Sequence, residues 1–113
     1  MVFAKAVGDL VLVLTSEVDS TVAEALAKEL LNRRLAACIS LREIKSHFWW
    51  EGKLQEDNEI QLLIKTTQGQ LENLLDAINL LHTYQTPELL YWNASASDPY
   101  RQWAEDITCS PPK

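Results

Sequence analysis

Apolar residues recur along the chain with two different spacings. Residues 9–15 form an almost continuous Leu/Val run, which predicts a short buried strand. Apolar positions from Val22 to Leu31 then follow helical spacing, with Asp19 or Ser20 available to cap the start and Arg33 and Arg34 in the last turn. The opening third therefore predicts a strand followed by a helix.

A long hairpin is predicted next. Residues 36–50 read as a strand whose apolar positions change phase near Arg42, which indicates either a bulge or a buried side that changes along the strand. Glu51, Gly52 and Lys53 suit a tight turn. Residues 54–66 begin acidic and then alternate apolar with polar, which predicts the returning strand.

The remaining elements complete a familiar order. Thr67 and Gln70 have the spacing of a capping box at the start of a second helix, which runs to His82. A strand over 88–94 and a short helix over 98–107 follow, the latter opened by Asp98 and Pro99.

The order β-α-β-β-α-β plus a C-terminal helix predicts an α+β, ferredoxin-like fold with two helices on one face of an antiparallel sheet. We expect one domain over 1–113, with its core at about 9–107 and a flexible tail over 108–113.

The tip of the predicted hairpin is aromatic. Phe48, Trp49 and Trp50 stand in succession, and neighbouring strand residues point to opposite faces. Trp50 continues the face of Phe48 and is expected to pack within its own hairpin. Trp49 points the other way: it either lies flat on its own chain or meets another subunit, and oligomerisation is the prediction, since monomers rarely expose such patches.

Composition narrows the class of partner. The 113 residues are 47% hydrophobic and 23% charged, typical of a soluble globular chain, and the net charge of −6 argues against nucleic acid. No segment approaches the roughly 20 apolar residues of a membrane span, and the opening MVFAKAVGDL is too short for a signal peptide. Two cysteines make no disulfide framework, which favours a reduced, cytoplasmic protein.

Few residues carry recognisable chemistry. His82 is either a ligand or proton donor beside Glu88, or a side chain capping helical carbonyls. Cys38 is either a soft metal ligand or a small buried residue. Lys65 is either an anion ligand or an exposed strand lysine. No nucleophile–base pair or common catalytic motif is visible, so an enzyme is not predicted.

Asp57 and Glu59 belong to an acidic run at the start of the returning strand. Carboxylates of this kind do acid–base work, bind hard cations or simply solvate the end of a strand.

Three separated stretches, LAACIS, FWWEGKLQEDNEIQLLIKTT and LHTYQTPELL, together resemble the CutA divalent-cation tolerance family over roughly 10–107. The resemblance implies a homotrimer of ferredoxin-like subunits, related in shape to the PII signalling proteins, in which the long hairpins pack across subunit boundaries. It also implies tolerance to copper and other divalent metals, with possible Cu(II) binding and no tightly bound cofactor.

The family motifs fall on particular residues here. Cys38, His82 and Glu88 match motif positions and are the expected metal ligands. Further matches are Trp50, Gly52, Lys53, Asp57, Glu59, Lys65, Thr66, Tyr84 and Pro87. Ser40, Thr83 and Gln85 depart from the family pattern, which has asparagine, proline and an acidic residue there; the last two departures weaken a metal site in that loop.

Two functions follow as expectations. The first is a non-enzymatic trimer of metal-ion response that binds divalent cations weakly. The second is a PII-like scaffold or small-ligand module whose cleft, with Lys65, Tyr84 and Glu88 as lining candidates beside Asp57 and Glu59, holds an anionic ligand or a partner.

Overall fold

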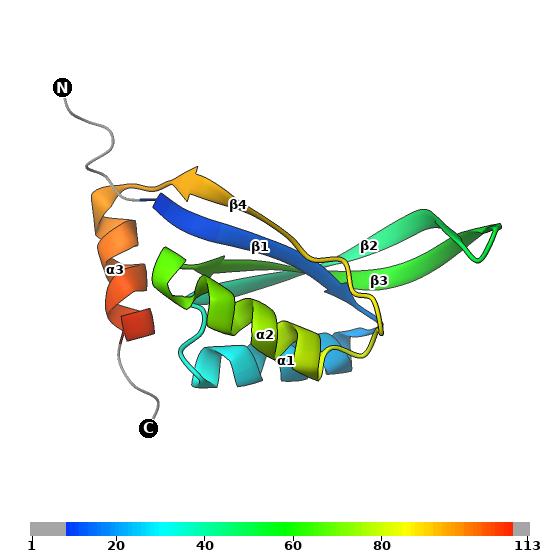
Figure 1. Cartoon of the computed structure of the whole chain (residues 1–113), viewed down its shortest axis with the longest axis horizontal. Coiled ribbons are helices and arrows are strands. Elements are labelled where there is room, and N and C mark those ends of the chain that lie inside the picture. Colours follow the sequence, from blue (N-terminus) through cyan, green and yellow to red (C-terminus); the bar gives the residue numbers. More distant parts are fainter. Residues whose placement is uncertain (1–8, 110–113) are drawn as a thin grey trace.

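The computed structural model describes residues 9–109 and has the predicted order of elements (Figure 1). The opening segment 1–8 and residues 110–113 of the predicted tail lie outside the described residues. The elements are β1 (Asp9–Glu17), α1 (Ser20–Asn32), β2 (Cys38–Trp50), β3 (Lys53–Thr66), the 3₁₀ turn η2 (Gln68–Gln70), α2 (Leu71–Leu81), β4 (Leu90–Ser95) and α3 (Asp98–Cys109).

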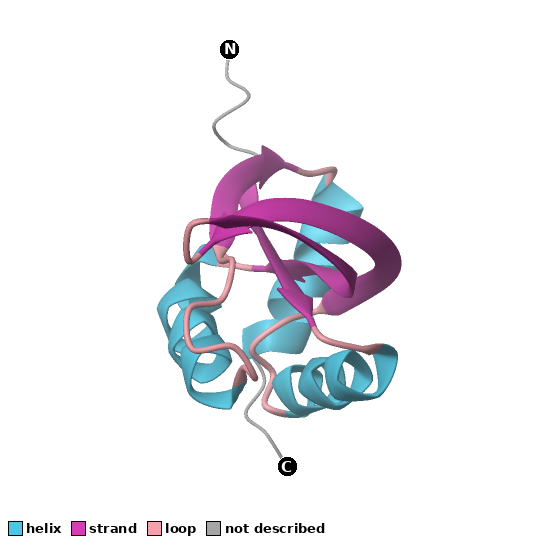
Figure 2. Ribbon diagram, turned by 90° about the vertical axis from the view of Figure 1, so that its right-hand side faces the viewer, coloured by secondary structure: helices cyan, strands magenta, loops and turns pink. Residues whose placement is uncertain are grey.

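The four strands form one antiparallel sheet in the order β2-β3-β1-β4. Helices α1 and α2 cover one face of this sheet, and α3 stands across the end where β1 begins (Figures 1 and 2). The predicted ferredoxin-like α+β fold is confirmed. Among residues 9–109, no helix combines the length and the apolar character that crossing a membrane requires.

The core lies between the sheet and the two helices because strand and helix periodicities present matching apolar faces. Alternate residues of β1 and β3, such as Val13 and Leu62, are fully buried, as are Leu30 of α1 and Ile78 of α2. Asp19 caps α1 as predicted: its Oδ1 accepts the N–H of Val22 at 2.9 Å. These buried residues belong to one core cluster between the sheet and the two helices.

The hairpin formed by β2 and β3 extends past the rest of the sheet (Figure 1). Pairing of β1 with β3 ends at Glu17–Ile60, whereas β2 and β3 stay paired in one register from Cys38–Lys65 to Trp50–Lys53. Residues 44–59 are therefore a two-stranded ribbon, and no other strand of the described part of the chain pairs with them. We call these residues the hairpin arm.

The register contains no bulge, which was one of the two explanations for the phase change in β2. The other explanation holds. Ile39 and Leu41 pack against the core, whereas Ile44 and Phe48, on the opposite face, are half-buried. The buried side of β2 changes because the strand leaves the helix-covered sheet and continues into the arm.

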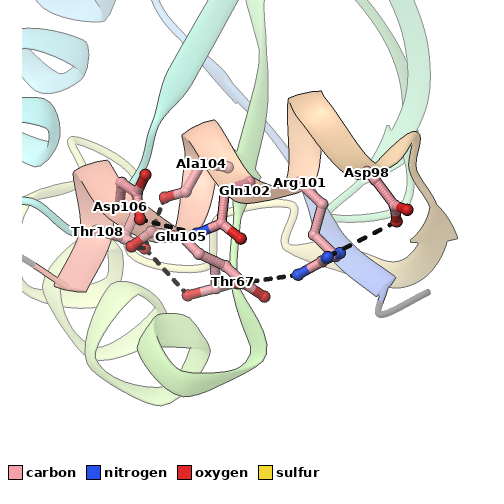
Figure 3. Close-up of polar contacts among 8 residues, drawn as sticks. All are labelled: Thr67, Asp98, Arg101, Gln102, Ala104, Glu105, Asp106 and Thr108. Atoms are coloured by element: carbon pink, nitrogen blue, oxygen red, sulfur yellow. Dashed lines mark hydrogen bonds and ion pairs between the residues drawn. The ribbon is translucent and has the colours of Figure 1, made fainter. Parts of the chain in front are cut away.

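The predicted capping box at Thr67 is wrong. Neither Thr67 nor Gln70 caps a helix with its side chain. Instead, Gln70 Nε2 donates to the carbonyl oxygen of Thr108 at 2.9 Å, and the hydroxyls of Thr67 and Thr108 lie 3.3 Å apart (Figure 3). Because Thr108 is buried and α3 ends at Cys109, the predicted flexible tail cannot begin at 108.

Helix α3 is also braced along its own surface. Arg101 lies 3.6 Å from Asp98 and 3.0 Å from Glu105, and Gln102 donates to Asp106 at 2.9 Å (Figure 3). Side-chain pairs at this spacing stabilise a helix by about 0.2–0.5 kcal/mol each.

The arm ends in a two-residue turn in which Glu51 and Gly52 have φ of 52° and 77°. Positive φ at both central residues is typical of a type I′ turn, which matches the twist of the strands.

We predict that Gly52→Ala lowers the free energy of unfolding by about 1–2 kcal/mol, because a side chain there is strained in the left-handed region. Urea denaturation measures the change.

Gly69→Ala is the matched control, since a Cβ at either glycine meets no heavy atom within 4 Å and only Gly52 has a positive φ. Gly69→Ala should be neutral or stabilise by up to about 1 kcal/mol. Equal destabilisation by both substitutions would contradict the assignment of strain to the turn.

Candidate functional site

His82 ends α2 with its side chain fully buried. Its Nε2 lies 2.6 Å from the carbonyl oxygen of Ser16, and its Nδ1 accepts the backbone N–H of Tyr84 at 2.9 Å. Because Nδ1 is an acceptor, the hydrogen-bond network assigns the ring proton to Nε2. Both ring nitrogens are engaged, so His82 binds a metal only by releasing one of these partners.

The carboxylate beside His82 is Glu17 rather than the predicted Glu88. Glu17 Oε2 lies 3.4 Å from His82 Nδ1 and accepts the N–H of Thr83 at 3.0 Å, while Oε1 accepts the N–H of Val18 at 3.1 Å. The side chain is fully buried at the end of β1. The His82 ring contacts a strand carbonyl instead of helical carbonyls, so the capping alternative is wrong, whereas its role as a ligand stays a prediction.

Sequence reasoning missed Glu17. Its partners Thr83 and His82 stand more than sixty positions away in the chain. One signal was available: Glu17 continues the alternation of Val11, Val13 and Thr15, the face of β1 that points into the core. A carboxylate on a buried face requires hydrogen-bonding partners.

Tyr84 connects this buried cluster to the base of the hairpin arm. Its phenol donates to Glu59 Oε2 at 2.7 Å, and its ring centroid lies 4.9 Å from that of His82. Burial is the main cause that raises the pKa of Tyr84 above its usual range, followed by the hydrogen bond to Glu59 and the charges of Glu59, Glu17 and Asp57. Three predicted cleft residues, Asp57, Glu59 and Tyr84, are thus electrostatically coupled.

Lys65 lies apart from this cluster, on β3, where it pairs with Cys38 of β2. Its Nζ donates to Ser40 Oγ at 2.7 Å and approaches Cys38 Sγ at 3.8 Å. Burial, and secondly the neighbouring Cys38, raises the pKa of Tyr100. Ser40, which departs from the family pattern, therefore supplies the acceptor for Lys65.

The three predicted metal ligands do not meet. Cys38 is level with Lys65 of β3, whereas His82 contacts Ser16, which pairs with Gln61. Four strand residues separate these levels, about 13 Å at the rise of a strand. Glu88 is exposed in the segment before β4.

Within residues 9–109, no group of three His, Cys, Asp or Glu side chains is placed to hold a metal ion. The donors present in one chain therefore do not fit a copper site made by Cys38, His82 and Glu88 together.

A cavity of about 520 Å³ opens at the base of the arm. Its polar lining includes the carboxylates of Asp19, Glu43 and Glu59 with one ammonium, Lys45, and its apolar lining is Val18, Ile44 and Ile60. Among the predicted cleft residues only Glu59 lines it. The excess of negative charge disfavours an anionic ligand in this cavity.

The aromatic residues of the arm differ in exposure. Phe48 is half-buried, whereas Trp49 is 73% exposed and Trp50 is 54% exposed. Trp50 was predicted to pack within its own hairpin, and in the single chain its position next to the turn leaves more than half of its surface exposed. The opposite edge strand, β4, also exposes apolar side chains that sequence reasoning did not single out: Leu90, Tyr91 and Trp92.

The fold defines this chain as a ferredoxin-like subunit with an extended hairpin. The model of the CutA1 divalent ion tolerance protein family matches residues 11–107, and the chain belongs to that family. The family is named for tolerance to divalent ions rather than for a catalytic activity.

Named relatives agree with this assignment. A divalent-cation tolerance protein CutA from Pyrococcus horikoshii is 36% identical over 100 residues, covering 88% of this chain and 98% of that protein. Another from Pectobacterium atrosepticum is 40% identical over 97 residues, covering 84% and 88%.

Solved structures are similar throughout the fold. CutA from Synechococcus elongatus superposes with a TM-score of 0.87 at 33% identity, covering 89% of this chain and 91% of that one. A protein from Archaeoglobus fulgidus, named as a periplasmic divalent cation tolerance protein CutA, has a TM-score of 0.85 at 28% identity, covering 88% and 98%.

We predict that substitutions at two of the expected metal ligands, His82 and Glu88, differ strongly in their effect on stability. His82→Ala should lower the free energy of unfolding by about 2–5 kcal/mol, because it opens a cavity and leaves buried groups of Ser16 and Tyr84 without partners. Glu88→Ala, at an exposed position, should change it by less than about 0.5 kcal/mol. Denaturation at one fixed protein concentration compares the variants, and a neutral His82→Ala would contradict the buried network.

The raised pKa of Tyr84 predicts a decline of stability in alkali. The unfolded phenol loses its proton near pH 10, whereas the folded one keeps it, so the free energy of unfolding falls as pH rises above about 10. This decline should be smaller in Tyr84→Phe. The near-ultraviolet tyrosinate signal that the substitution removes should appear well above pH 10; its appearance near pH 10 in folded protein would contradict the assignment.

Proposed function

We propose that this protein acts as a cytoplasmic homotrimer in tolerance of copper and other divalent cations, binding the ions weakly and catalysing no reaction. The observation that carries the proposal is the hairpin arm, which exposes apolar side chains and an unpaired strand edge. Membership of a divalent ion tolerance family supports the metal side of the proposal.

Two different apolar edges favour a closed ring. β2 and β4 are the outer strands of the sheet, so each presents backbone groups with no strand partner among residues 9–109. The arm adds Trp49 and Trp50 at one edge, and β4 adds Tyr91 and Trp92 at the other. When unlike surfaces of identical copies join, the contact is heterologous and closes into a ring if the rotation allows. A trimer buries both edges in this way.

The metal side of the proposal places weak sites where subunits meet. One chain brings no three suitable ligands together among residues 9–109, so a second copy must complete the coordination. Half-buried Cys38 offers a soft thiolate, and exposed Glu88 offers a hard carboxylate. His82 joins as a ligand only after its ring releases Ser16 or Tyr84.

Absence of catalysis is proposed from the one acid–base pair described above. Glu17 Oε2 lies 3.4 Å from His82 Nδ1, but both side chains are fully buried. Backbone groups of Ser16, Val18, Thr83 and Tyr84 occupy their polar atoms. This pair stabilises the fold and offers no open position for a substrate.

A PII-like scaffold or small-ligand module is the second candidate. The cavity of about 520 Å³ at the base of the arm supports it, since pockets of this size hold small ligands. Its acidic lining favours a cationic ligand over the anionic one that a cleft with Lys65 would take. Because the cavity lies next to the arm, ligand binding in the cavity and assembly of the trimer are linked in this second candidate.

The trimer predicts a solution mass three times the 12.8 kDa of the chain. Trp49→Glu should shift the mass toward the monomer, because it places a charge in the proposed contact. Leu80→Glu is the control, since Leu80 is 78% exposed on α2 and belongs to neither strand of the arm. Analytical ultracentrifugation checks both variants, and a monomeric wild type would sink the proposal.

Copper titration tests the ligands. Cys38→Ser and Glu88→Gln should each weaken copper binding by about tenfold or more, as expected when a coordinating group is lost. His82→Asn should leave the affinity unchanged. Unchanged affinity in both Cys38→Ser and Glu88→Gln would remove these two residues from the role, and weaker binding by His82→Asn would show that its ring is released to the metal. Thermal-shift measurements with metals and small metabolites decide between the candidates, because a response to metabolites alone favours the second.

A further inference from the structure

The arm leaves the sheet at a point where few elements support it. Glu17–Ile60 is the last pair between β1 and β3, and Glu59 is the next residue outward, paired with Ile44 of β2. Beyond Glu59, within residues 9–109, the arm is held by bonds between its own two strands. A two-stranded ribbon twists readily, so a contact at its base decides the direction in which the tip points.

Tyr84 supplies such a contact from a segment that is hydrogen-bonded to β1. The segment His82–Tyr84 is fixed to the end of β1, because His82 bonds the Ser16 carbonyl and the Thr83 N–H bonds Glu17. Both Glu17 and His82 are fully buried, so these bonds are shielded from water. From this segment the Tyr84 phenol donates a hydrogen bond to Glu59 Oε2 at 2.7 Å.

We propose that the Tyr84–Glu59 hydrogen bond is a strap that sets the direction of the hairpin arm and thereby the strength with which a second copy of this chain is held. The inference rests on the proposed trimer. Tyr84 and Glu59 are positioning residues in it: they act on the arm, and the arm meets the partner.

Removing the strap should weaken assembly without unfolding the subunit. Tyr84→Phe deletes one oxygen and keeps the ring against His82, so the packing at 4.9 Å is retained. A hydrogen bond to a charged acceptor corresponds to about tenfold or more in an equilibrium constant. We expect the protein concentration at which the trimer half-dissociates to rise by about that factor. Amide hydrogen exchange over residues 42–46 and 57–61 should accelerate.

Matched variants separate positioning from general destabilisation. Glu59→Ala should reproduce the Tyr84→Phe effect, Glu59→Gln should restore most of the assembly because its amide oxygen still accepts, and the double variant should be no worse than either single one. Tyr91→Phe is the control for loss of a phenol oxygen, since Tyr91 is exposed on β4. Circular dichroism confirms that each subunit stays folded.

The outcomes distinguish this inference from the trimer itself. A trimeric wild type whose assembly and arm exchange are unchanged in Tyr84→Phe and Glu59→Ala overturns the strap alone. A monomeric wild type overturns the proposed trimer and the effect on assembly together. Arm exchange in that monomer then decides whether the strap acts: faster exchange in Tyr84→Phe supports it, and unchanged exchange rejects it.

Discussion

The uninterrupted pairing of β2 with β3 is the constraint on which the rest of the structure depends. It holds one register over thirteen pairs and continues beyond the last pair of β1 with β3. Because a strand presents both faces and both edges, every residue past that point lacks the helix layer that buries the core. Exposed Trp49 and Trp50 are the direct result, and the proposed trimer would cover them.

A buried polar cluster stabilises the place where the arm begins. Removing a carboxylate and an imidazole from water is costly unless their polar atoms are bonded, and Glu17 and His82 satisfy this condition through backbone groups of β1 and the segment after α2. Because both ring nitrogens of His82 are hydrogen-bonded, it binds a metal only by releasing Ser16 or Tyr84. Tyr84 extends the cluster to Glu59, so the interior of one subunit is connected to the surface proposed to meet another.

Local pattern was sufficient to predict the elements, their order, the turn at Gly52 and the cap at Asp19, because each depends on residues a few positions apart. Features that depend on distant partners were missed. Glu17 pairs with Thr83, and Gln70 bonds Thr108 instead of capping its own helix. The change of buried side in β2 was visible in the sequence. Its cause appears only in the sheet, where β2 and β3 remain paired beyond the last residue of β1. Motif matching grouped Cys38 with His82, which the register of the sheet separates.

Contacts made by the Trp49 ring test the central claim most directly. In an isotope-filtered nuclear magnetic resonance experiment on an equal mixture of labelled and unlabelled protein, only contacts between different copies are detected. The account predicts cross-peaks between the Trp49 ring protons and side chains of another copy. A well-resolved Trp49 signal with no such cross-peak, at concentrations where the protein is assembled, would show that the arm points into solvent and would contradict the account.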